Sequence, residues 1–156
     1  MFNGDLTSHH DKYMREALKL AETAFFKDEV PVGAVVVYNN RIIGRGYNQV
    51  EMLCDPTAHA EMLALSAACT TLHEKYLSHC TLYVTLEPCM MCTGAIVWSK
   101  LERVVFGAMD VKAGSCGTVF NLAANKKLNH QTEIIQGILE QECSDILKRF
   151  FRSKRT

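Results

Sequence analysis

The sequence predicts a layered α/β domain built on a mainly mixed β-sheet. Segments rich in Val and Ile alternate along the chain with segments of helical composition. That order is typical of sheets covered by helices. The 156 residues suffice for one hydrophobic core, so residues 1–156 are expected to form a single domain. No internal repeat, low-complexity block or long linker interrupts the pattern.

The composition indicates a soluble protein of a reducing compartment. Apolar residues make up 48% of the chain, charged residues 22%, and the formal net charge is 0, so the whole molecule is not an obvious polyanion binder. The seven cysteines are odd in number and lie mostly in apolar runs, which argues against a disulfide framework. No signal peptide precedes the first helix, and the longest apolar run, residues 30–38, is too short to cross a bilayer. We therefore expect a cytoplasmic protein with no membrane partner.

The first predicted element is a helix over residues 8–29, with Ser8 as its N-cap. Apolar residues recur there at helical spacing and share one face. That face comprises Met14, Leu18, Ala21 and Phe25. Residues 33–48 then predict a β-hairpin that turns at Asn39 and Asn40.

The remaining elements alternate between helix and strand. The segment of residues 89–100 is apolar nearly all round, so this short helix is expected to be buried. Glycines 107, 114 and 117 give the loop of residues 108–118 the backbone freedom to fit around something. The other predicted elements are a helix over residues 58–76, strands over residues 80–87, 103–107 and 132–138, and a last helix over residues 140–155.

The stretch EPCMMC, residues 87–92, carries the first candidate for chemistry. A Cys-x-x-Cys pair can be a redox couple, half of a structural zinc knuckle or part of a catalytic metal site. Many such pairs in cytosolic proteins are chemically idle. Upstream, TAHAEM places His59 two residues before Glu61, a pair that is also idle when it stands alone.

The position of these pairs relative to helices favours a shared site. Residues two apart in a regular helix do not face the same way, so His59 and Glu61 can share a target only at a helix start. Cys89 and Cys92 follow the helix-breaking Pro88 and are expected at a second helix start. Two helix N-termini would then bring positive dipole ends to one spot, which favours thiolate and hydroxide.

The number of ligands favours a catalytic over a structural metal. Two thiolates and one imidazole make three ligands, whereas a structural zinc takes four. No second Cys-x-x-Cys and no His-x₃-His is present to close the site. A free coordination position beside a carboxylate is the arrangement for metal-activated water, with Glu61 as the acid–base group.

At these residues the sequence resembles the zinc-dependent nucleoside and nucleobase deaminases, whose signature is His-x-Glu followed by Pro-Cys-x-x-Cys. It is most similar to the bacterial tRNA-specific adenosine deaminases. The similarity covers most of the chain, and its motifs are specific in combination. They are EVPVGAVVV, IGRGYN, DPTAHAE, LYVTLEPCMMCTGAI, RVVFGAMD and FFRSKR. The loop of residues 109–120 departs mildly, because Met109 and Cys116 are not expected there.

The resemblance implies a cytidine deaminase-like fold, a three-layer α/β/α sandwich around a five-stranded mixed sheet, usually assembled as a homodimer. It implies one Zn²⁺ per chain, bound by His59, Cys89 and Cys92, with Glu61 as proton shuttle. The implied reaction is hydrolytic deamination of adenosine to inosine at the wobble position of a tRNA anticodon, by zinc-activated water. The substrate contacts assigned on this basis include Asn48, Ala60, Pro88 and Asp110. Asn48 could instead cap a strand, and Asp110 could serve turn chemistry.

The C-terminal segment suggests where RNA would bind. Lysines and arginines stand at five positions after residue 147, with no acid after Asp145 and with Phe150 and Phe151 between them. Cations interleaved with aromatic rings suit an unpaired RNA loop, since phosphates meet the cations and bases stack on the rings. We therefore add Phe150, Arg152 and Lys154 to the expected substrate contacts. The alternative is a solvated helix end with at least one Phe in the core.

Two other functions remain open at this stage. A deaminase of free guanine or cytosine would use the same chemistry without needing a basic tail. A non-catalytic RNA-binding subunit could keep zinc as a structural element, although such a site has no need of Glu61.

Overall fold

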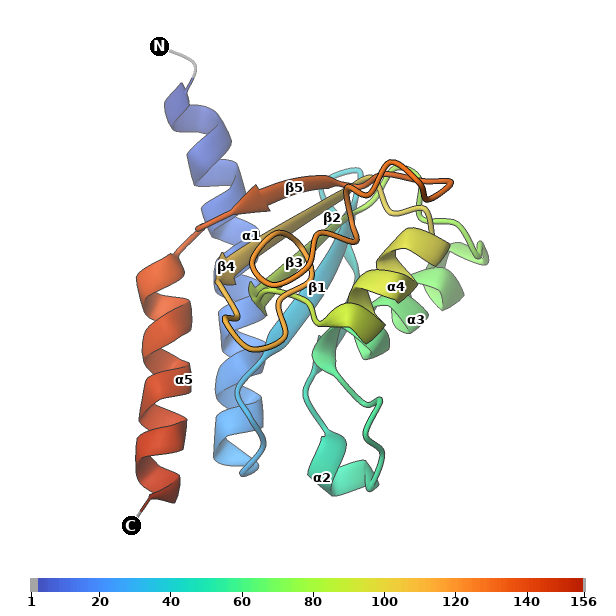
Figure 1. Ribbon diagram of the computed structural model, residues 1–156. Coiled ribbons are helices and arrows are strands. Elements are labelled where there is room, and N and C mark those ends of the chain that lie inside the picture. The colour runs from blue at the N-terminus through green and yellow to red at the C-terminus, as the bar shows by residue number, and fades with distance from the viewer. Residues whose placement is uncertain (1–2, 156) are drawn as a thin grey trace.

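The computed structural model describes residues 3–155 and confirms the predicted α/β fold with a five-stranded mixed sheet (Figure 1). The strand order is β2-β1-β3-β4-β5. β1 pairs antiparallel with β2 and with β3, and β3, β4 and β5 run parallel. The strands are β1 (Gly33–Tyr38), β2 (Arg41–Tyr47), β3 (Thr81–Leu86), β4 (Arg103–Ala108) and β5 (Glu133–Gln136).

Helices cover both faces of the sheet and complete the three layers. α1 and α5 lie on one face, α3 and α4 on the other, and the short α2 connects β2 to α3 (Figure 1). The helices are α1 (Asn3–Phe26), α2 (Val50–Leu53), α3 (Ala60–Leu72), α4 (Met90–Trp98) and α5 (Glu140–Lys154). Among the described residues, no helix is both long and apolar enough to cross a membrane.

The core consists of two layers because successive strand residues point to opposite faces. On β1, Val35 packs with α1 and Val36 packs with α3, and both are fully buried. β3 repeats the pattern, with Tyr83 towards α1 and Val84 towards the other layer. The predicted face of α1 is confirmed in its centre, where Met14 is fully buried.

Several predicted boundaries were wrong. α1 begins at Asn3, so Ser8 lies inside the helix and is not its N-cap. The helix ends at Phe26, before Asp28 takes a left-handed φ of 63°. α3 is shorter than predicted because His73, with φ of 54°, ends it. The short helix α2 was not predicted, because its four residues make barely one turn.

The prediction that α4 is buried throughout was also wrong. Cys92, Thr93 and Ile96 are buried, but the side chain of Trp98 is 84% exposed and that of Met90 is 56% exposed. A Cβ built on Gly94 would meet no atom within 4 Å. One side of this apolar helix therefore lies open in the single chain.

Two glycines of β2 allow α3 to lie directly on the strand. A Cβ on Gly44 would stand 2.4 Å from the carbonyl oxygen of Ala64, and one on Gly46 would stand 2.3 Å from that of Ala60. Backbone atoms at these distances cannot yield without a shift of the helix. The sequence IIGRGYN therefore sets how closely the start of α3 approaches the sheet.

Gly46→Ala is expected to lower the free energy of unfolding by about 1–3 kcal/mol, because the new methyl group must displace α3. Chemical denaturation of the purified protein measures the change. Arg45→Ala, at the exposed position between the two glycines, is the matched control and should change stability by less than about 0.5 kcal/mol. Equal stability of Gly46→Ala and the parent would contradict the close packing described for α3.

Candidate active site

The residues at the centre of the site come from the starts of two helices. His59 is the extended N-cap residue of α3, and Cys89 is the extended N-cap residue of α4. Glu61 lies in the first turn of α3, and Cys92 lies in the first turn of α4. The expectation that both pairs stand at helix starts is confirmed. Each helix thus directs its unpaired backbone N–H groups and its positive dipole end towards this region.

Three donor atoms converge between the two helices. The Nδ1 atom of His59 lies 3.7 Å from the Sγ atom of Cys89 and 3.5 Å from that of Cys92. One ligand atom from each of these residues lies within 4.8 Å of the others. Among the described residues, they form a group of metal-ligating type, with two sulfur donors and one nitrogen donor. This combination of soft and intermediate donors suits zinc.

The three groups perturb one another's protonation. The hydrogen bond with Cys92, supported by that with His59, lowers the pKa of the Cys89 thiol to about 3. The pKa of Cys92 is raised instead, first because its thiol bonds to the Cys89 thiolate and second because it is buried. Hydrogen bonding to Cys89 raises the pKa of His59. Without a metal ion, the protein therefore favours the thiolate form of Cys89 only. A bound cation would favour the thiolate forms of both Cys89 and Cys92.

Glu61 is a buried carboxyl group beside this cluster. Its side chain is 4% exposed. Burial, which disfavours the charged form, raises its pKa above the ordinary value for a glutamate. A carboxyl group in that state holds its proton more readily than an exposed glutamate, which suits a group that both accepts and donates a proton.

A cavity of about 880 Å³ opens over these groups. Its lining joins six parts of the chain: the segment after α1, the connection around α2, the start of α3, the connection from β3 to α4, the loop after β4, and the C-terminal end of α5. Of the expected substrate contacts, five line it, namely Asn48, Ala60, Asp110, Phe150 and Lys154. His59, Glu61 and Cys89 also line it. The volume accommodates a nucleobase with part of its nucleotide.

Asn48 and Asp110 also have structural partners. Asn48 donates from Nδ2 to the carbonyl oxygen of Val30 at 3.2 Å and accepts at Oδ1 from the Val50 N–H at 3.3 Å. Asp110 accepts at Oδ1 from the backbone N–H groups of Lys112 and Ala113, a turn of the kind that the sequence left open as an alternative. These bonds orient the two side chains at the cavity without using all of their polar atoms.

Pro88 and Arg152 lie outside the lining of this cavity. Pro88 is buried, and its carbonyl oxygen accepts a hydrogen bond from the Ser115 N–H at 2.9 Å. Arg152 lines a second cavity of about 530 Å³, beside the loop after β4. That cavity has five cationic side chains in its lining, those of Lys112, Lys148, Arg152, Lys154 and Arg155.

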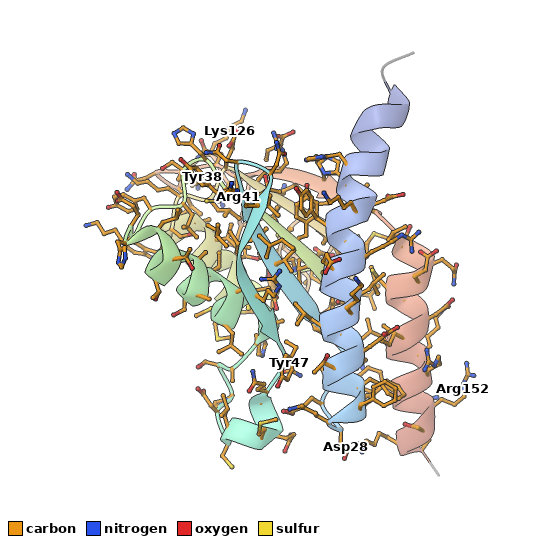
Figure 2. All side chains as sticks on the ribbon, turned by 180° about the vertical axis from the view of Figure 1, so that it is seen from behind. Asp28, Tyr38, Arg41, Tyr47, Lys126 and Arg152 are labelled. Carbon is orange, nitrogen blue, oxygen red and sulfur yellow. The ribbon has the colours of Figure 1, made fainter. Side chains whose placement is uncertain are left out.

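The C-terminal aromatic residues divide between core and surface. Phe150 is 6% exposed and Phe151 is 46% exposed, which confirms that at least one of the two belongs to the core. Lys154 forms an ion pair with Asp28, two residues after the end of α1. Figure 2 shows Asp28 and Arg152 at the same end of the molecule as Tyr47, and Lys126 at the opposite end.

Two buried carboxylates at this site were not predicted. Glu29 is 1% exposed and accepts from the backbone N–H groups of Glu51 and Met52. Glu87 is 2% exposed and accepts from the N–H groups of Asp110, Cys116 and Thr118 and from the Thr118 hydroxyl. The sequence signal that could have indicated them is an acidic residue next to an apolar strand, which is Glu29 in EVPVG and Glu87 in LEPC.

The chain is similar to known deaminases in sequence and structure. Residues 8–155 match the MafB19-like deaminase family. The chain is 51% identical, over 92% of its length, to a tRNA-specific adenosine deaminase of Bacillus subtilis, of which it covers 89%. It is 47% identical, over 93% of its length, to a tRNA-specific adenosine deaminase of Haemophilus influenzae, of which it covers 84%.

Solved structures show the same relationship. One from a study of A-to-I editing by tRNA:A34 deaminases at the wobble position of transfer RNA superposes with a TM-score of 0.84 at 38% identity, over 87% of this chain and 99% of the other. A guanine deaminase of Nitrosomonas europaea superposes with a TM-score of 0.77 at 26% identity, over 90% of this chain and 83% of the other. The chain therefore belongs to the MafB19-like deaminases and, within them, to the family of the tRNA-specific adenosine deaminases.

Proposed function

We propose that this protein deaminates adenosine to inosine at the wobble position of a tRNA anticodon. The observation that carries the proposal is the convergence of His59, Cys89 and Cys92 beside Glu61, at a cavity that His59, Cys89 and Glu61 line. The relatives with highest identity quoted above are tRNA-specific adenosine deaminases, which supports adenosine in RNA as the substrate. On this proposal residues 1–156 act as a single deaminase domain.

One zinc ion per chain would be held by His59, Cys89 and Cys92. The donor set fits zinc, and with three protein ligands one coordination position stays open. When bound there, zinc would supply Lewis-acid chemistry that activates water near neutral pH.

Glu61 would carry the protons of the reaction. Hydrolytic deamination adds a proton to the purine ring and another to the departing amino group. A carboxyl group whose pKa is raised by burial holds a proton at a pH where an exposed glutamate has lost it. Ala60, between His59 and Glu61, lines the cavity through which the base would enter.

The cavity walls would orient the nucleotide. The carboxamide of Asn48 keeps one N–H unused by the bonds described above and would donate it to the base. Asp110, held in its own turn, would face the ribose or the backbone. Pro88 is buried and directly precedes Cys89, so it would position Cys89 beside the substrate.

The end of α5 would bind the RNA around the target nucleotide. Arg152, Lys148 and Arg155 are exposed cations beside the second cavity, and the exposed ring of Phe151 stands among them. Phosphates and unstacked bases of an anticodon loop match such a surface. Lys154 would exchange its Asp28 partner for a phosphate. A loop base is already partly unstacked, so presenting it costs less than flipping a base out of a duplex.

A free-base deaminase is the second candidate function. It is favoured by the structural likeness to a guanine deaminase. That likeness has lower identity than the likeness to the tRNA:A34 deaminase structure, and the basic end of α5 would have no role in it. A non-catalytic RNA-binding role would leave the buried Glu61 without a function.

The protein is also proposed to act in the cytoplasm as a homodimer. Its seven cysteines are all free, which suits a reducing compartment. The open side of α4, with Trp98 and Met90 exposed, is the kind of apolar surface that a second subunit covers.

Substitutions at the centre should separate metal binding from proton transfer. Cys89→Ser is expected to lose both zinc and activity, because it removes a ligand. Glu61→Gln should keep zinc and RNA binding but lose activity by about 10²–10⁴-fold or more, because it removes the proton carrier. Metal analysis and deamination rates of the purified variants provide the measurements. A Glu61→Gln variant of normal rate would refute the shuttle, and active parent protein without zinc would refute the metal site.

The substrate is tested by offering an adenosine-containing anticodon stem-loop, free guanine, free cytosine and free adenine side by side. We expect inosine and ammonia from the stem-loop, at a higher kcat/KM than ammonia release from any free base. Faster consumption of free guanine or cytosine would replace the proposal with the second candidate function.

Replacement of Arg152, Lys154 and Arg155 together by Ala should weaken stem-loop binding and flatten its dependence on salt. Phosphate contacts release counterions, and each contact to single-stranded nucleic acid contributes about 0.7 to the log–log slope. Fluorescence anisotropy over a salt series measures both effects. The control is Lys126→Ala with Lys127→Ala, two exposed cations of which Lys126 lies at the opposite end of the molecule (Figure 2). If the tail variant binds like the control at every salt concentration, α5 does not contact the RNA.

Trp98→Lys should convert the dimer into a monomer, because a charge would be buried in the proposed interface. Sedimentation velocity measures the oligomeric state. Phe26→Lys replaces another exposed aromatic side chain, 83% exposed on α1, and should leave the dimer intact. A Trp98→Lys variant that sediments as a dimer would place the interface elsewhere.

A further inference from the structure

The carboxylate of Glu29 connects two parts of the cavity wall. The residue lies between α1 and β1, and its side chain is 1% exposed. Oε1 accepts from the Glu51 N–H at 2.8 Å, and Oε2 accepts from the Met52 N–H at 3.1 Å. No ion pair between described residues includes Glu29. Both oxygens of this buried group are therefore committed to the backbone of α2.

The same two segments hold Asn48. The Asn48 N–H donates to the Val32 carbonyl at 3.1 Å, and its Nδ2 donates to the Val30 carbonyl at 3.2 Å. Its Oδ1 accepts from the Val50 N–H at 3.3 Å. Glu29 thus bonds the chain just after Asn48, while its neighbour Val30 bonds the Asn48 side chain itself. The orientation of the carboxamide depends on how residues 29–32 and 48–52 are held together.

We propose that Glu29 is a positioning residue, which fixes residues 48–52 so that the Asn48 carboxamide meets the substrate base in one orientation. The inference rests on the proposed function, in which Asn48 donates to the base. Glu29 lines the cavity, but each of its two oxygens already accepts a bond from the backbone of α2, so the role that we assign to it is exerted through Asn48. The two bonds join the segment after α1 to α2, which gives a reason for a carboxylate to be buried there.

Glu29→Gln tests the proposal with almost no change of shape. An amide can accept at one oxygen only, so its NH₂ group would face a backbone N–H and leave that donor unpaired. We expect kcat/KM for the stem-loop to fall about tenfold, mainly through KM, with zinc content unchanged. Glu22→Gln makes the same chemical change at an exposed position of α1 and should behave like the parent.

A double-mutant cycle with Asn48→Ala shows whether the effect passes through Asn48. Asn48→Ala alone should also lower kcat/KM about tenfold, and the double variant should fall no more than about twofold below it, because the carboxamide that Glu29 positions is already gone. Effects that multiply would show that Glu29 acts independently, and an Asn48→Ala variant of normal activity would remove its target. Either result overturns the proposal, as would a Glu29→Gln variant with the parent's KM.

Two further measurements keep the test decisive. If Glu29→Gln does not fold, the cycle is repeated with Glu29→Asp, which keeps the charge but shortens its reach. Hydrogen exchange needs no substrate, and Glu29→Gln should speed exchange of the Glu51 and Met52 amides at least tenfold. Unchanged exchange would overturn the role of Glu29 by itself. Parent protein that does not deaminate the stem-loop would refute the proposed function alone, leaving the exchange result to decide on Glu29.

Discussion

The meeting of two helix starts at one point is the constraint on which the rest of the site depends. His59 and Cys89 both stand at N-cap positions, with extended backbone, and so project away from their own helices towards the gap between them. For the two projections to meet, α3 and α4 must lie at fixed depths on the same face of the sheet. Gly44 and Gly46 set the depth of α3 by allowing its backbone to contact β2. The glycines of the second strand are thus as much part of the site's geometry as the ligands.

Three buried carboxyl groups surround this point, and their surroundings assign them different roles. Glu29 accepts hydrogen bonds from backbone N–H groups of α2, and Glu87 accepts them from the loop after β4, which makes both residues anchors for the walls of the cavity. Among the described residues, Glu61 bonds instead with its own backbone and with Cys92, and burial raises its pKa. Carboxyl groups in one site can serve different purposes when their environments differ in this way. On the proposed function, Glu61 is the carboxyl group of the three that exchanges a proton.

Features that depend on residues close together in the sequence were predicted, whereas contacts between residues far apart in the sequence were not. The five strands and the four long helices follow local periodicity, and the ligand set follows short spacings at helix starts. Glu29 and Glu87 bind backbone groups 22 and 29 residues further along the chain, so no spacing pattern marks them. The exposed side of α4 was missed because its apolar composition matches that of a buried helix. An apolar composition indicates that a helix face is buried, but it does not indicate whether the same chain or another subunit buries it.

The fold supplies the chemistry without choosing the substrate. A guanine deaminase shares the fold with this chain at a TM-score of 0.77, although only 26% of the residues agree. On the proposed function, the preference for one substrate over another must therefore come from features other than the fold. Two parts qualify here: the wall formed by residues 48–52, where Asn48 reaches the cavity, and the end of α5, where Arg152 and its neighbours concentrate positive charge in a chain of net charge 0. A free base presents no phosphates to that charge, whereas an anticodon loop presents several. On the proposed function, the cations of α5 therefore favour a polynucleotide over a free base, and the choice among bases falls to the wall that carries Asn48.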